Sequence, residues 1–302
     1  MGVGSFSGVV GNGDARYDAR AMNENADPLG TRWRGWKAAL AGLNGFVLLL
    51  RWRRPELYRA CLSENIRRGE EYLEWGLPAR DPISFLLEQR PTESPRKERL
   101  EMPARLTDAG GTSVGELAIL AAVTRLLQPR CVFEIGTFNG RTTSVFLMNA
   151  PAEARVYSLD LPPDTKPNSE AMIDSDCRLV ERRRLAAYVY EHGLEARFEQ
   201  LLGDSMAFDP ARFEGRVELG FIDGAHALAY VRNDTEKMAR MITPQGMVFW
   251  HDYGGRGRFG PLTAYLESLQ KKFALFRVPG TTLAWTTGGE LRKLLAAPSS
   301  LK

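Results

Sequence analysis

The chain of 302 residues is 44% hydrophobic and carries a formal net charge of only +3. This composition supplies enough apolar side chains for one large or two modest globular domains. The basic residues are spread along the chain, so charge does not indicate a nucleic-acid partner. The three cysteines form no CxxC pair, which argues against a disulfide framework or a structural zinc site and favours a cytoplasmic protein.

Residues 1–30 are rich in glycine, asparagine and aspartate, and we expect them to form a disordered tail. A mainly helical region is predicted over 31–105, as a cap over the main domain's pocket, an oligomer contact or a membrane-surface contact. Its most apolar run, at 38–50, would be about 20 Å long as a helix, which is short of a hydrocarbon core of about 30 Å. Such a helix suits a buried or homo-oligomer contact. Because tryptophans and arginines flank the run within 32–54, peripheral membrane contact is the alternative.

Residues 89–103 combine three prolines with a cluster of charges and predict a linker or surface loop. We therefore place the main domain over 106–302. Expected strands and helices alternate along it: strands at 131–136, 154–161, 196–204, 218–223 and 246–252, and helices at 114–127, 179–193 and 227–242. This alternation predicts an α/β fold with a mostly parallel sheet and helices on both faces. In such sheets ligands bind beyond the carboxyl ends of the strands.

Polar residues follow each of the expected strands. The first strand ends in FEIGTFNGRTT, where Gly136 and Gly140 permit a tight turn toward a helix N-terminus. The spacing lacks the GxGxxG pattern of dinucleotide folds. Later strands end in SLDL, LLGDS, FIDGAH and FWHD, which present Asp160, Asp204, Asp223 and then a histidine with an acid. Each feature alone is equally well explained as a turn.

As a set, the segments FEIGTFNGRTT, YSLDLP, GDSMAFD, FIDGAHALAYVRND and PQGMVFWHDY resemble class I S-adenosylmethionine-dependent methyltransferases. The similarity is to a bacterial group with FEIGTFxGRTT, FIDGAH and WHDY signatures, related to catechol-type O-methyltransferases. It covers roughly residues 110–286. The resemblance implies a Rossmann-like sheet of seven strands in which the last strand is antiparallel.

The resemblance also implies where S-adenosyl-L-methionine would bind. Asp160 would accept the ribose hydroxyls, and the adenine would lie beside Asp204 and Ser205. The implied cofactor-binding set is Glu134, Gly136, Thr137, Gly140, Thr142, Asp160, Gly203, Asp204, Ser205 and Asp223.

A hydroxyl acceptor needs a base or a metal to become nucleophilic near neutral pH. His226 is the candidate base, with Asp223 and His251 as further catalytic candidates. Related enzymes hold magnesium with acids at the ends of these two strands, and Asp223, His251 and Asp252 occupy the matching positions. Because one ligand is then a histidine, the set favours a more nitrogen-tolerant metal such as manganese or zinc over magnesium. The alternative is a metal-free pocket.

The predicted function is therefore O-methylation of a small hydroxylated metabolite or sugar. One alternative is a hydroxylase-like enzyme of the same fold. Another is a non-catalytic, membrane-associated protein with a vestigial cofactor site. No segment of the sequence predicts a nucleic-acid substrate.

Overall fold

The computed structural model describes residues 76–89, 99–104, 111–165, 172–254 and 259–296. All of them belong to one compact unit, Arg67–Lys302. The disordered tail expected at 1–30, the apolar helix at 38–50, and the oligomer or membrane contact through 32–54 lie outside the described residues.

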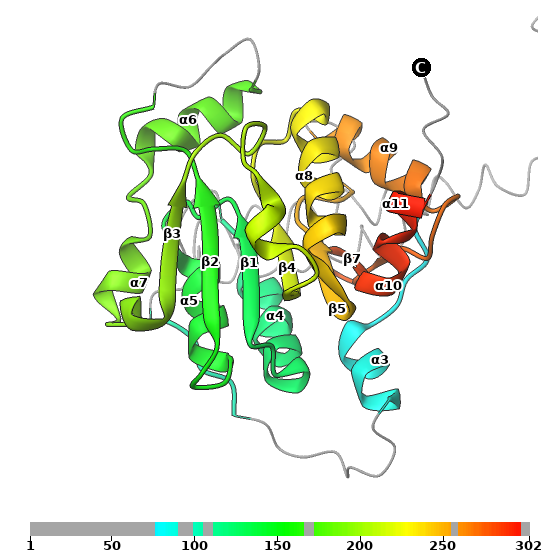
Figure 1. The fold of residues 1–302 in the computed structure, drawn as a ribbon, viewed down its shortest axis with the longest axis horizontal. Coiled ribbons are helices and arrows are strands. Elements are labelled where there is room, and N and C mark those ends of the chain that lie inside the picture. Colours follow the sequence, from blue (N-terminus) through cyan, green and yellow to red (C-terminus); the bar gives the residue numbers. More distant parts are fainter. Residues whose placement is uncertain (1–75, 90–98, 105–110, 166–171, 255–258, 297–302) are drawn as a thin grey trace, which may run out of the picture. The chain divides into compact units, whose positions relative to one another are not determined.

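Seven strands form one sheet in the order β3-β2-β1-β4-β5-β7-β6 (Figure 1). They are β1 (Cys131–Ile135), β2 (Arg155–Asp160), β3 (Phe198–Leu202), β4 (Val217–Ile222), β5 (Ile242–Trp250), β6 (Phe276–Arg277) and β7 (Ala284–Thr287). Strands β1 to β5 pair in parallel, whereas β7 pairs antiparallel with both β5 and β6. The predicted fold class is confirmed. The chain order reverses between β1 and β4, which is where ligands bind in open sheets of this kind.

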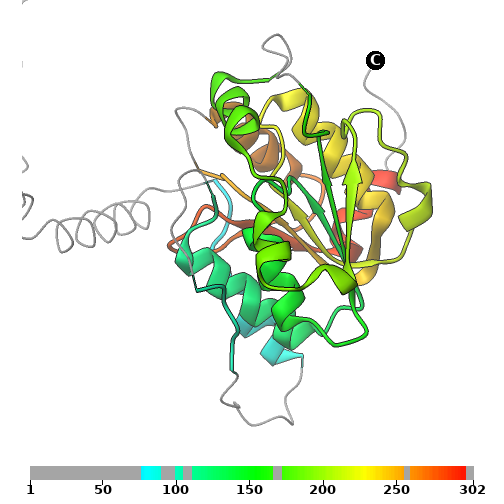
Figure 2. The same ribbon diagram turned by 90° about the vertical axis from the view of Figure 1, so that its left-hand side faces the viewer.

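Helices cover both faces of the sheet, as the two orthogonal views show (Figures 1 and 2). One layer holds α3 (Pro82–Glu88), α4 (Val114–Leu127), α5 (Arg141–Asn149) and α7 (Ala187–Glu191). The other holds α8 (Leu228–Met241), α9 (Gly260–Leu269) and the short α10 (Gly288–Leu291) and α11 (Lys293–Ala296). Helix α6 (Asp174–Arg182) lies at the carboxyl ends of the strands, and two 3₁₀ turns, η1 (Glu195–Arg197) and η2 (Pro210–Phe213), flank β3.

The strand sequences explain this layering, because successive side chains point to opposite faces. In β5, Val248 and Trp250 pack with the α8 and α9 side chains, whereas Met247 and Phe249 pack with those of α4 and α5. All four are essentially inaccessible to solvent. A run without polar residues is what a strand buried on both faces requires.

The single helix expected at 179–193 is two helices in the structure. Helix α6 ends at Arg182 and α7 begins at Ala187, and Ala186 between them is left-handed, with a φ of 54°. The amide of Ala186 donates to the Phe138 carbonyl at 3.0 Å, so the chain bonds here to the loop after β1. This tertiary contact divides the expected helix, and the local hydrophobic periodicity of the sequence could not indicate it.

Residues 76–89, which the sequence assigned to the N-terminal helical region, pack against the sheet. The amide of Leu77 donates to the Tyr253 hydroxyl at 3.0 Å, and that of Arg80 donates to the Arg277 carbonyl at 3.0 Å. Leu86 on α3 is buried in the α4 and α5 side of the core. The predicted linker at 89–103 therefore does not separate these residues from the main domain.

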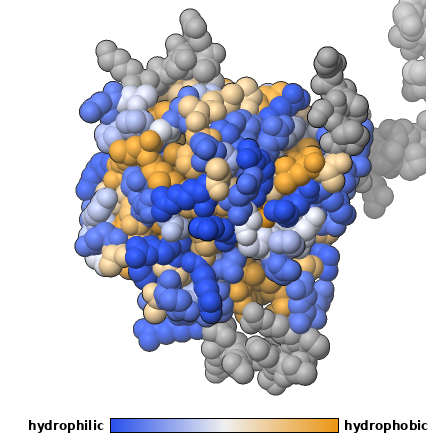
Figure 3. Space-filling view, viewed as in Figure 1, coloured by the Kyte–Doolittle hydropathy of each residue, from blue (hydrophilic) through white to orange (hydrophobic). Residues whose placement is uncertain are grey.

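Blue hydrophilic and orange hydrophobic residues interleave on the face turned toward the viewer in Figure 3. No helix among the described residues is both long enough and apolar enough to cross a bilayer.

Candidate functional site

A cavity of about 310 Å³ lies at the carboxyl ends of the five strands β1 to β5. This size is at the lower end of the range of about 300–1,000 Å³ found for small-molecule sites. Its wall includes most of the predicted site residues: Gly136, Thr137, Thr142, Asp160, Gly203, Asp204, Ser205, Asp223, His226, His251 and Asp252. Strand ends that are far apart in sequence thus open into one space.

Gly136 brings the ends of β1 and β4 together at the switch point of the sheet. Its φ is +100°, and a Cβ built on it would lie 2.0 Å from the carbonyl oxygen of Asp223. Its amide donates to the Leu159 carbonyl at 2.8 Å, which ties the turn to β2 as well. Only glycine combines this backbone conformation with so close an approach.

Asp160 stands at the end of β2 with its carboxylate held by backbone amides. Its Oδ2 accepts from the Phe138 amide at 2.8 Å, and its Oδ1 accepts from the Leu161 amide at 2.7 Å. Arg183 Nε lies 4.0 Å from Oδ1. Burial raises the pKa of Asp160, although these donors and Arg183 act in the opposite direction. The carboxylate is oriented by the loop after β1 and lines the cavity.

Asp204 and Ser205 follow β3 at another part of the cavity. Asp204 Oδ1 accepts from the Met206 amide at 2.9 Å, and its Oδ2 accepts from the Tyr230 hydroxyl at 3.1 Å. The Ser205 carbonyl accepts from Asn233 Nδ2 at 2.9 Å. Helix α8 therefore holds the turn after β3 in place.

Glu134 and Gly140 are absent from the cavity wall formed by the described residues. Glu134 is fully buried behind it, where its Oε2 accepts from the Thr143 hydroxyl and, at 2.6 Å, from the Ser158 hydroxyl. Burial raises the pKa of Glu134 to about 8, against the effect of both hydroxyls. Gly140 is the N-cap residue directly before α5, and a Cβ on it would meet the Cα of Ala186 at 2.8 Å. These two residues support the wall rather than form it.

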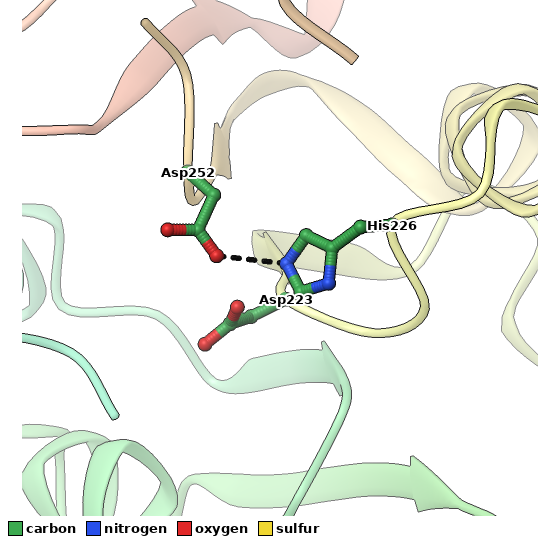
Figure 4. Close-up of side chains that lie close together, drawn as sticks. All are labelled: Asp223, His226 and Asp252. Atoms are coloured by element: carbon green, nitrogen blue, oxygen red, sulfur yellow. Dashed lines mark ion pairs between the residues drawn. The ribbon is translucent and has the colours of Figure 1, made fainter. Parts of the chain in front are cut away.

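Asp223, His226 and Asp252 converge at the ends of β4 and β5 (Figure 4). One potential ligand atom from each lies within 4.8 Å of the others. Asp252 Oδ2 is 2.8 Å from His226 Nε2, the ion pair drawn in the figure. Asp252 has a φ of 60°, a conformation that aspartate tolerates better than most residues.

The second ring nitrogen of His226 contacts α6. Its Nδ1 lies 2.8 Å from Asp176 Oδ1, and the backbone amide of His226 donates to Asp176 Oδ2, also at 2.8 Å. Burial lowers the pKa of His226, but hydrogen bonds to Asp176 and Asp252 outweigh it and raise the pKa to about 9. The imidazole is therefore charged at neutral pH while both carboxylates hold it.

His251 lies between the carboxylates and the start of α4. Its Nε2 is 3.2 Å from Glu116 Oε2, and its Nδ1 is 3.2 Å from Asp223 Oδ1 and 3.3 Å from Asp252 Oδ2. Burial disfavours the charged ring, but the two aspartates hold the pKa of His251 well above its usual value. Nδ1 is buried and makes no well-directed hydrogen bond with any described residue.

These donors fit a divalent cation. The predicted ligands were Asp223, His251 and Asp252, and the structure also brings His226 to the same pair of carboxylates. Two carboxylates with an imidazole form a mixed oxygen and nitrogen set, which suits manganese at least as well as magnesium. The buried His251 Nδ1, which faces both acids without a good hydrogen bond, is the atom that a cation would satisfy.

Sequence reasoning missed Asp176, Glu116 and Arg183. Asp176 lies between the strand expected at 154–161 and the helix expected at 179–193, although acidic residues in a first helical turn are a signal for α6. Ser113 and Glu116 form a capping box, which marks the start of α4 but not the contact of Glu116 with His251. Arg183 directly follows α6, and its Nη2 donates to the Leu161 and Pro162 carbonyls at 3.0 and 2.6 Å.

Residues 133–253 match the family described as a methyltransferase domain. The match spans well under half of the chain. It begins within β1 and ends just after β5, so it contains every strand end that opens into the cavity. A search of the curated proteins gave no match.

Several solved structures are similar at low identity. A methyltransferase from Geobacter sulfurreducens is 19% identical, with 72% of this chain and 93% of that chain covered and a TM-score of 0.41. A putative caffeoyl-CoA O-methyltransferase from Staphylococcus aureus is 15% identical, with coverage of 68% and 91% and a TM-score of 0.42. The O-methyltransferase TomG from Streptomyces achromogenes, in complex with SAM, is 15% identical, with coverage of 70% and 91% and a TM-score of 0.42.

Proposed function

We propose that the protein transfers a methyl group from S-adenosylmethionine to a hydroxyl oxygen of a small molecule. The observation that carries the proposal is a single cavity that joins two kinds of strand end. The ends of β1, β2 and β3 supply a glycine turn and oriented carboxylates, and those of β4 and β5 supply two acids and two imidazoles. The methyltransferase-domain match over residues 133–253 supports the same assignment.

The cofactor would extend along the first three strand ends. Asp160 would accept the ribose hydroxyls, and the Phe138 and Leu161 amides that fix its carboxylate at the cavity wall support this role. Asp204 and Ser205 would take the adenine, and Gly136 and Thr137 would lie along the methionine part. When bound, S-adenosylmethionine supplies a methyl group already activated by its sulfonium. The chain then has to align an acceptor and remove one proton.

His226 is the proposed base. At present its Nε2 faces Asp252, so the acceptor hydroxyl would replace Asp252 as the partner of Nε2. When Asp252 leaves Nε2, one of the two carboxylate contacts that raise the pKa of His226 is lost, so this pKa falls. The neutral ring can then accept a proton near neutral pH. The hydroxyl proton would pass to Nε2 as the acceptor oxygen forms its bond to the methyl carbon and the carbon–sulfur bond breaks.

A divalent cation would be held by Asp223 and Asp252 with His251 Nδ1 as the nitrogen ligand. This assignment leaves His226 Nε2 free, whereas ligation through Nε2 would exclude a role as base because one lone pair cannot serve both. The cation would polarise the acceptor hydroxyl and lower its pKa. Glu116 contacts His251 Nε2, the ring nitrogen that faces away from the cation, and would orient the ring.

The experiment is a mass-spectrometric screen of hydroxylated metabolites and sugars with the full chain and S-adenosylmethionine, with and without chelator. The proposal expects a product heavier by one methylene. Its formation should cease in chelator and return with magnesium or manganese. A product heavier by one oxygen would instead identify a hydroxylase, and turnover that is indifferent to chelator would eliminate the metal.

A further inference from the structure

Asp176 is the carboxylate that α6 places against His226. It is 4% exposed and lies in the first turn of the helix. Its Oδ2 accepts from the backbone amide of His226 and its Oδ1 contacts the ring Nδ1, both at 2.8 Å. A single side chain thus fixes both the loop after β4 and the imidazole that this loop carries.

Two carboxylates hold the His226 ring, Asp176 at Nδ1 and Asp252 at Nε2, each at 2.8 Å. An ionised carboxylate can only accept hydrogen bonds, so both nitrogens carry protons while both contacts persist. Asp176 is the fixed partner, because it is more buried than Asp252 and also accepts from the His226 amide. Once the acceptor replaces Asp252 at Nε2, the neutral ring keeps its proton on Nδ1 and its lone pair is on Nε2. A neutral histidine with the opposite tautomer would present N–H, and no lone pair, to the reacting centre.

We propose that Asp176 is a positioning residue that holds His226 as the Nδ1–H tautomer, so that the Nε2 lone pair faces the acceptor. The role in turnover rests on the proposed methyl transfer, but the tautomer itself does not. Asp176 lines the cavity, and its proposed role is to act on the reaction through the imidazole and not by contact with the reacting atoms.

Hydrogen bonds hold helix α6 against the site at both of its ends, which gives Asp176 a fixed position. At the far end, Arg183 Nη2 donates to the Leu161 and Pro162 carbonyls, next to Asp160. Between the two ends, Leu179 and Val180 line the cavity. The helix that covers the proposed cofactor site therefore also sets the orientation of the proposed base.

The substitution Asp176→Asn separates positioning from simple anchoring. The amide oxygen can keep the bond from the His226 backbone, but the amide nitrogen then faces Nδ1 and can only donate. The ring must move its proton to Nε2 and lose the lone pair there. A substitution that is nearly isosteric thus reverses the tautomer with little change in packing. Asp174→Asn, at an exposed position on the same helix, is the matched control.

The first readout is ¹⁵N NMR of the imidazoles in the full chain carrying Asp252→Ala, which removes the carboxylate from Nε2 as the acceptor would. The pH is raised until the His226 signals show that the ring is neutral. The chain has only three histidines, and His226→Ala identifies the signals. In this background we expect the Nδ1–H tautomer with Asp176 intact and with Asp174→Asn, and Nε2–H with Asp176→Asn. An Nε2–H ring with Asp176 intact, or a tautomer unchanged by Asp176→Asn, would overturn the proposal.

The second readout is turnover. Asp176→Asn should lower kcat by roughly 10²- to 10⁴-fold, the usual contribution of a general base, with KM and cofactor affinity little changed. A kcat equal to that of the wild type together with a reversed tautomer would also overturn the positioning role. If the wild type turns over no acceptor, the proposed function fails, whereas the NMR result still decides the tautomer.

Discussion

The two halves of the cavity are built by different means. At the ends of β1 to β3, the backbone shapes the site: Gly136 turns where no side chain fits, and amides orient Asp160. At the ends of β4 and β5, charged side chains shape it, with His226 and His251 alternating with carboxylates. The rigid backbone at the ends of β1 to β3 suits a ligand that is the same in every reaction cycle. The imidazoles and carboxylates at the ends of β4 and β5 can change their protonation and their partners, as a reaction requires.

This difference predicts that each half can be damaged without the other. We call the ends of β4 and β5 the reacting half of the cavity and the ends of β1 to β3 the cofactor half. Substitutions in the reacting half should alter turnover and leave cofactor affinity intact. Substitutions in the cofactor half should weaken cofactor binding and leave the reacting half intact. The following expectations run from the largest effect to the smallest.

His226→Ala should abolish most methyl transfer while cofactor binding persists. Removal of a general base typically costs roughly 10²- to 10⁴-fold in rate. Turnover is measured by mass spectrometry and cofactor affinity by isothermal titration. The control is His192→Ala, since His192 is exposed directly after α7 and its replacement should leave both quantities unchanged. Wild-type turnover in His226→Ala would show that the imidazole is not the base.

Glu134 should make the stability depend on pH. Burial raises the pKa of Glu134 in the folded state to about 8 from its ordinary value of 4.5. Between these values the folded state keeps a proton that the unfolded state releases, so the stability falls as the pH rises through this window. At about 1.4 kcal/mol per pKa unit, the loss is on the order of a few kcal/mol.

Urea unfolding of the wild type and Glu134→Gln at pH 5 and pH 8 measures this effect. The variant cannot ionise and should lose less stability over the window. The exposed Glu153→Gln should follow the wild type. Parallel pH profiles for the wild type and Glu134→Gln would show that Glu134 does not titrate there.

Asp160→Ala should weaken cofactor binding and spare the reacting half. Loss of a charged hydrogen-bonding partner costs about 1.5–3 kcal/mol, or roughly 10- to 150-fold in affinity. The ¹⁵N signals of His226 should stay where they are in the wild type. The exposed Asp164→Ala in the same loop is the control. Altered imidazole signals in Asp160→Ala would contradict the independence of the two halves.

Tyr230→Phe should have the smallest effect. It removes one hydrogen bond to Asp204, worth about 0.5–1.5 kcal/mol. We expect a loss of a few-fold in cofactor affinity by titration and an unchanged kcat. Tyr190→Phe, at an exposed site on α7, should change neither. A fall in kcat with unchanged affinity would place Tyr230 in the reacting half instead.

Much of the cofactor half could be predicted from the sequence, because its parts are contiguous. A strand followed at once by glycines or an acid specifies both the element and the edge on which the residue lies. Gly136, Asp160 and Asp204 accordingly reach one cavity, as the motifs indicated. Glu134 was placed in a buried strand, but only the structure shows that it lies behind the wall.

The partners of the histidines could not be predicted in this way. Asp176 is far from His226 in sequence, and Glu116 is farther still from His251. Their contacts depend on where α6 and the start of α4 settle on the sheet, which no local pattern encodes. The break before α7 has the same origin, since Ala186 bonds to the loop after β1.

The central claim is that this cavity binds S-adenosylmethionine through Asp160, and isothermal titration tests it most directly. The full chain should bind one S-adenosylmethionine per chain. Asp160→Ala should weaken this binding, and His226→Ala should preserve it. A well-folded wild-type protein that gives no binding heat, or one whose affinity is unaffected by Asp160→Ala, would contradict the account.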